Sequence, residues 1–126
     1  MEDLQRFFKE KQEPFRLETY ISFWEVVDKI VGISENIKGD SNNELDHYYW
    51  SDVYYYIKNH LLFVFNKLKP YMSSETLSFV KWFVDKLLES VEKRDKKLLL
   101  FTVYSNKQKL MDKMEEDFSK VFQLTS

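Results

Sequence analysis

The stretch between Ser41 and Lys69 constrains the fold more than any other part of the sequence. It contains five of the eight tyrosines and one of the three tryptophans. At a period of 3.6 residues, apolar side chains cover most of its circumference and leave only a narrow polar stripe. Its main apolar face consists of Trp50, Val53, Tyr54, Ile57, Leu61, Val64, Phe65 and Leu68. A helix of this kind must contact neighbours on at least two sides, so we expect it to be the central helix of a helical fold, with the other segments packed against it.

The two ends of this helix are marked by the sequence itself. Ser41 followed three residues later by Glu44 has the spacing of a capping box, in which each side chain bonds the backbone N–H of the other residue. Pro70 disfavours the helical conformation at the preceding residue and has no N–H to donate. These signals predict one helix over residues 41–69.

The remaining sequence also predicts helices. Only two glycines and two prolines occur, so there are few positions for the turns of a sheet-rich fold. Apolar periodicity indicates further helices over residues 2–12, 14–38, 74–93 and 97–123. We therefore expect an all-α single domain over residues 1–126, an antiparallel bundle of four long helices plus a short N-terminal helix.

The expected helix ends depend on a few residues. Gly39 is expected to cap the end of helix 14–38, and Ser73 or Ser74 the start of helix 74–93. No glycine or proline separates helix 74–93 from helix 97–123, so one long helix exchanged between two copies is an alternative. A continuous helix would rotate its apolar face by roughly 160° near residue 95. We therefore expect a turn over residues 94–96.

Composition excludes several classes of function. The net charge is −2, which gives no general affinity for nucleic acids or membranes. No apolar run is long enough to span a bilayer, and the first residues are too charged for a signal peptide. The chain has no cysteine, and therefore no disulfide framework or thiolate metal site. A cytoplasmic protein is expected.

Motifs for catalysis are missing from the sequence. There is no glycine-rich phosphate loop, no nucleophile elbow and no His-Glu-x-x-His pair. Glu44 and His47 have the spacing of half a di-metal carboxylate site, but a second copy is lacking and the capping box already explains Glu44. His60 is expected at the margin of the aromatic core. We expect no enzyme activity, no cofactor, no metal and no small-molecule substrate.

Two features predict an apolar surface that binds a protein. Tyr48, Tyr55 and Leu62 are spaced seven residues apart and interrupt the polar stripe of their helix. Trp82 lies on the polar side of helix 74–93. The N-terminal helix could cover either feature, but exposed aromatic clusters otherwise mark partner surfaces. The expected function is a non-enzymatic interaction module, either self-associating or an adaptor or inhibitor protein.

A basic stretch supports an alternative function. Residues 93–113 contain seven basic and two acidic side chains, with Phe101 and Tyr104 nearby. Such a patch could contact phosphates and stack bases, as in an accessory subunit that binds RNA or DNA. Residues 1–56 hold twelve acidic and six basic side chains, so the basic stretch could equally meet another copy. The candidate nucleic-acid residues are Lys93, Arg94, Lys96, Lys97, Lys107 and Lys109.

Overall fold

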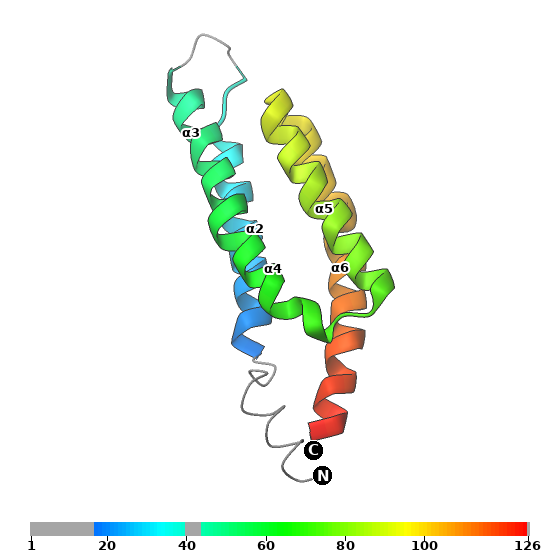
Figure 1. Ribbon diagram of the computed structural model, residues 1–126. Coiled ribbons are helices and arrows are strands. Elements are labelled where there is room, and N and C mark those ends of the chain that lie inside the picture. The colour runs from blue at the N-terminus through cyan, green and yellow to red at the C-terminus, as the bar shows by residue number, and fades with distance from the viewer. Residues whose placement is uncertain (1–16, 40–43, 126) are drawn as a thin grey trace.

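The computed structural model describes residues 17–39 and 44–125, with side chains described for 17–39 and 44–120 (Figure 1). This part of the chain is helical and has no strand, which confirms the all-α prediction. The expected helix over residues 2–12 lies outside the described residues. Ser41 also lies outside the described residues, so the structure does not test the capping box predicted between Ser41 and Glu44.

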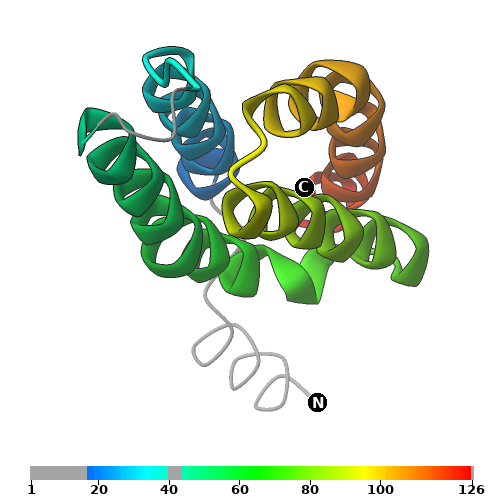
Figure 2. The ribbon, with the colours of Figure 1, turned by 90° about the horizontal axis from the view of Figure 1, so that it is seen from above.

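Helices account for nearly all the described residues. In chain order they are α2 (Leu17–Glu35), α3 (Glu44–Tyr55), the π-helical η1 (Tyr56–Leu61), α4 (Leu62–Leu68), the 3₁₀ turn η2 (Lys69–Tyr71), α5 (Ser74–Lys93) and α6 (Lys96–Thr125). Figure 1 shows α2 beside the α3–α4 segment and α5 beside α6. From above, these helices surround a common interior (Figure 2).

The helix that contains the aromatic stretch contacts the other helices to different extents. The α3–α4 segment packs against α2 on one side and α5 on the other, as its two apolar sides require. The main contacts of α6, however, are with α5 and α2. The aromatic helix is therefore packed mainly against α2 and α5, whereas the main partners of α6 are α5 and α2.

The core combines large apolar side chains from every long helix. Aromatic pairs connect α2 to the other half of the molecule: Trp24 lies edge-on to Phe83 of α5 at 6.4 Å, and Tyr20 lies edge-on to Phe118 of α6 at 5.2 Å. The fully buried side chains include Phe23, Val27, Ile30, Ile57, Leu61, Phe83, Leu87, Leu99, Leu110 and Met114.

The turn between α5 and α6 occurs where the change of phase predicted it. Arg94 adopts the left-handed conformation at φ 50°, and its N–H bonds the carbonyl oxygens of Ser90 and Val91. The Asp95 side chain then accepts the N–H of Leu98 at 3.0 Å and caps α6. Residues 74–125 therefore form two helices, and the single long helix is excluded.

The start of α5 is anchored by a carboxylate from α6. Ser73 caps α5, because its hydroxyl oxygen accepts the N–H of Thr76 at 3.2 Å. The backbone N–H of Ser73 donates to Asp117 at 2.9 Å. Burial raises the pKa of Asp117, but the hydrogen bonds from Ser73 and Thr76 outweigh it and hold this pKa below its ordinary value. The ionised carboxylate thus fixes α6 against the beginning of α5.

A second carboxylate closes the connection between α2 and α3. Helix α2 ends at Glu35, so Gly39 is not its C-cap, although Gly39 does have a positive φ of 84°. The N–H groups of Lys38 and Gly39 donate to the two oxygens of Asp46, at 3.0 and 2.9 Å. Asp46 lies in the first turn of α3 and is buried. This carboxylate therefore ties the segment after α2 to the start of α3.

Candidate interaction surfaces

The aromatic helix contains a π turn that changes the phase of everything after it. In η1, the N–H of Leu62 donates to the carbonyl oxygen of Ile57, a bond between residues five apart. A π turn holds one more residue than an α turn. Side chains after η1 are therefore displaced by one position relative to an uninterrupted α-helix.

A row of buried side chains runs through the π turn. Trp50, Val53 and Ile57 form a buried row before the π turn. His60 follows Ile57 by three residues and Leu61 follows it by four; His60 is exposed and Leu61 is buried. Leu61, which the apolar periodicity placed on the main face, is therefore in the core, and His60 lies outside it.

The same displacement changes the exposed row on the opposite side. Tyr48 is 69% exposed and Tyr55 is 52% exposed. Leu62, expected to continue this row, is partly buried and packs against the core, whereas Phe63 is 59% exposed. Phe63 follows Tyr55 by eight positions, and one of these positions is the extra residue of the π turn. We call Tyr48, Tyr55 and Phe63 the aromatic line.

Charged residues of opposite sign lie at the two ends of the aromatic line. Glu44 and Asp52 are exposed, and each is four residues from Tyr48, which puts them on the same side of α3. Lys67 follows Phe63 by four residues, and its Nζ lies 4.7 Å from the Phe63 ring centroid. Asp52 lies between Tyr48 and Tyr55, so we call Glu44 the acidic end and Lys67 the basic end of the line.

A cluster of rings borders the aromatic line on the side of α2. The His60 ring lies 5.4 Å from that of Tyr55 and 5.0 Å from that of Tyr56. Lys29 of α2 lies 5.9 Å from the Tyr56 ring centroid. Tyr54, which was expected on the main apolar face, is exposed and lies near Lys58. The aromatic line is therefore part of a wider exposed aromatic surface on α3, η1 and α4.

Trp82 belongs to a different surface. It is 44% exposed, and its ring lies edge-on to Phe79 at 5.9 Å. Lys109 of α6 lies 5.7 Å from the Phe79 ring centroid, so this patch borders α6. The aromatic line lies instead on α3 and α4, which pack against α2. The structure therefore separates Trp82 from Tyr48 and Tyr55.

The outer face of α6 exposes two further aromatic side chains. Phe101 is 69% exposed, and Tyr104 is exposed three residues later. The Tyr104 hydroxyl donates to Glu35 of α2 at 2.9 Å, and this hydrogen bond raises the pKa of Tyr104. Tyr104 is thereby fixed to α2, whereas Phe101 extends into solvent.

Four of the candidate basic residues surround one cleft. Lys93, Arg94, Lys96 and Lys97 line a cavity of about 520 Å³ at the α5–α6 turn. Lys38, far away in the sequence, lines the same cavity from the segment after α2. Both segments lie at the same end of the molecule (Figure 1). We call this cavity the basic cleft.

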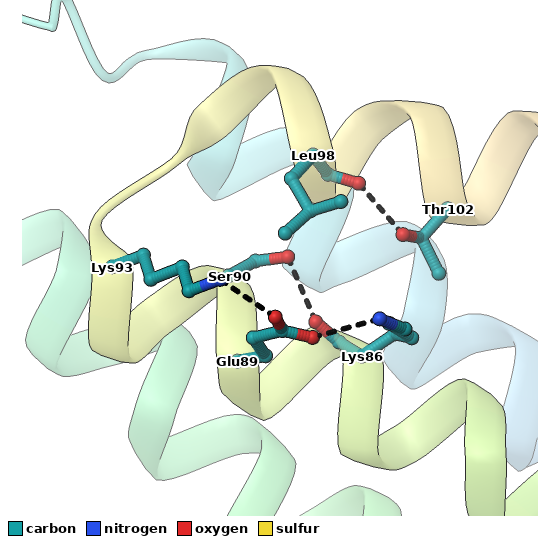
Figure 3. Close-up of polar contacts among 6 residues, drawn as sticks. All are labelled: Lys86, Glu89, Ser90, Lys93, Leu98 and Thr102. Atoms are coloured by element: carbon teal, nitrogen blue, oxygen red, sulfur yellow. Dashed lines mark hydrogen bonds and ion pairs between the residues drawn. The ribbon is translucent and has the colours of Figure 1, made fainter.

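Some cations of the basic cleft already have partners. Glu89 lies between Lys86 and Lys93, at 3.0 and 2.8 Å, as Figure 3 shows. The Lys93 and Lys86 ammonium groups lower the pKa of Glu89 to about 2. Lys96 donates to the carbonyl oxygens of Glu35 and Ile37 at the end of α2. Lys93 is therefore partly neutralised, and two hydrogen-bond donors of Lys96 are occupied.

The two remaining candidate lysines do not join the basic cleft. Lys107 forms an ion pair with Asp28 at 3.1 Å and lies 6.0 Å from the Trp24 ring centroid, so it faces α2. Lys109 lies against Phe79 of α5. The two lysines point to different neighbours because residues two apart lie on nearly opposite sides of a helix. The six candidate residues thus do not form one continuous surface.

Within the described ranges, no group of three or more histidine, aspartate or glutamate side chains could hold a metal ion. In the same part of the chain, no helix combines the length and apolarity needed to cross a membrane. Comparisons with protein-family models, curated proteins and solved structures found no match. The functional argument therefore depends on the surfaces described above.

Proposed function

We propose that this protein is a non-enzymatic interaction module that self-associates through the aromatic line on α3 and α4. The observation that carries this proposal is the exposure of Tyr48, Tyr55 and Phe63 in one row, with opposite charges at its two ends. Large aromatic side chains dominate the binding energy of protein interfaces, whereas their exposure to water on a lone monomer is unfavourable.

A second copy of the chain is the partner that fits this surface. In a two-fold symmetric dimer, the same surface of both copies must be complementary to itself. Antiparallel pairing of two aromatic lines places the acidic end of one copy against the basic end of the other. Tyr55, at the middle of the line, then lies next to Tyr55 of the second copy. Parallel pairing would oppose like charges, which disfavours it.

Other functions receive less support from the arrangement of side chains. An adaptor or inhibitor that uses the same aromatic surface needs a different protein with a complementary charge pattern. An extended nucleic-acid surface over residues 93–113 is weakened because Lys107 is paired with Asp28 and Lys109 faces α5. The proposal retains an antiparallel bundle, a single domain and a cytoplasmic location.

Sedimentation of the wild-type protein and two matched variants tests this function. We expect a dimer for the wild type and a monomer for Phe63→Glu, because the new charge would be buried in the interface. The control Phe101→Glu makes the same change at a site of comparable exposure on α6 and should remain dimeric. Circular dichroism verifies that both variants are folded. A wild type that is monomeric at every concentration contradicts the proposal, as does equal dissociation of both variants.

A further inference from the structure

We propose that the basic cleft binds a small ligand that carries several phosphate charges. The cleft is independent of the aromatic line and lies between the segment after α2 and the α5–α6 turn. It is lined by five cationic residues, one acidic residue, one glycine and one leucine. Its volume of about 520 Å³ is in the range of small-ligand sites, which is roughly 300–1,000 Å³.

The single acidic residue of the cleft does not neutralise it. One Asp95 side-chain oxygen accepts the N–H of Leu98 and caps α6. Lys38 and Lys97 are exposed, and neither side chain forms an ion pair or a hydrogen bond with another described residue. Two full positive charges therefore face solvent at the cleft with no partner among the described residues. A phosphate group could accept hydrogen bonds from both ammonium groups without breaking a hydrogen bond within the protein.

Arg94 adds a planar donor at the centre of the turn. Its guanidinium contacts both nitrogens of the His47 ring, at 2.9 and 3.5 Å, so α3 holds this side chain in place. An arginine placed in this way can bind two phosphate oxygens at once. The α6 N-terminus, whose first N–H groups lack helical partners, also begins at this cleft.

The backbone at Arg94 supplies a separate observation. This residue is the only described non-glycine residue with a positive φ, and it stands at a helix C-cap where glycine is the favoured residue. A side chain kept in an unfavourable conformation indicates a role that offsets the strain. Glycine at this position should relieve the strain but remove the guanidinium, so stability and ligand affinity should change in opposite directions.

The test measures binding of tripolyphosphate by isothermal titration at low ionic strength. We expect saturable binding of one tripolyphosphate per chain, weakening steeply as salt is added. Arg94→Gly should lower the affinity about tenfold while the melting temperature stays equal or rises. Lys38→Glu combined with Lys97→Glu should abolish binding. The control Lys81→Glu changes an exposed lysine of α5 outside the cleft and should bind like the wild type.

Further titrations distinguish the sources of the phosphate charge. ATP and a 5′-phosphorylated oligonucleotide should compete with tripolyphosphate, whereas an oligonucleotide without terminal phosphate should compete poorly. Absence of saturable tripolyphosphate binding by the folded wild type overturns the proposal. The proposal is also overturned if Lys81→Glu weakens tripolyphosphate binding as much as the cleft variants do. Tighter binding of the unphosphorylated oligonucleotide would instead establish a nucleic-acid surface. None of these results depends on dimer formation, which sedimentation measures separately.

Discussion

Deletion of Ser51 should lower the free energy of unfolding by roughly 5 kcal/mol, whereas deletion of His60 should change it by less than about 1 kcal/mol. Both residues are exposed and both belong to the aromatic helix. Removing Ser51 from the regular α3 rotates Asp46 and Trp50 away from the core by about 100° relative to Val53. Removing His60 takes the extra residue out of the π turn and restores α-helical bonding without changing the phase of the flanking rows.

Thermal unfolding followed by circular dichroism measures this contrast directly. The variant without His60 should unfold cooperatively near the wild-type temperature and remain a dimer, because Phe63 stays in line with Tyr55. The variant without Ser51 should lose its cooperative transition or unfold far below the wild-type melting temperature. If both deletions destabilise the protein equally, the π turn does not hold a removable residue, and the register assigned to Phe63 loses its basis.

Replacing Asp46 by alanine should cost about 3 kcal/mol, because two backbone N–H groups lose a charged acceptor in a buried position. For a domain of this size the melting temperature should fall by roughly 10 °C. Asp46→Asn should cost less, since the amide oxygen still accepts one of the two bonds. The control Asp52→Ala removes an exposed carboxylate from the same helix and should change stability by less than about 0.5 kcal/mol. Equal effects of the two alanine variants would show that Asp46 does not hold the connection.

The parts of the fold that depend on apolar periodicity were predictable from the sequence. The change of phase near residue 95 predicted the α5–α6 turn, and Ser73 was one of two expected caps for α5. Such features depend on neighbouring residues along the chain. The α2–α3 connection was not predictable, because it depends on hydrogen bonds between Asp46 and residues seven and eight positions earlier.

The candidate site was predicted only in part, for two physical reasons. The π turn displaced the row of exposed side chains, so Phe63 takes the place expected for Leu62. A signal for this was present: Ile57, Leu61 and Phe65 are spaced by successive steps of four, with polar His60 where a step of three would fall. Lys38 reaches the basic cleft only through the folding of the chain, which no local pattern indicates.

Cross-linking through introduced cysteines tests self-association most directly, because the natural chain contains no cysteine. Antiparallel pairing places residue 55 next to its own counterpart, so Tyr55→Cys should give a covalent dimer with a short thiol cross-linker. A mixture of Tyr48→Cys and Phe63→Cys should cross-link more efficiently than either variant alone, while Phe101→Cys should stay monomeric on a denaturing gel. Efficient dimer formation by Phe101→Cys, or none by Tyr55→Cys, would contradict an interface centred on the aromatic line.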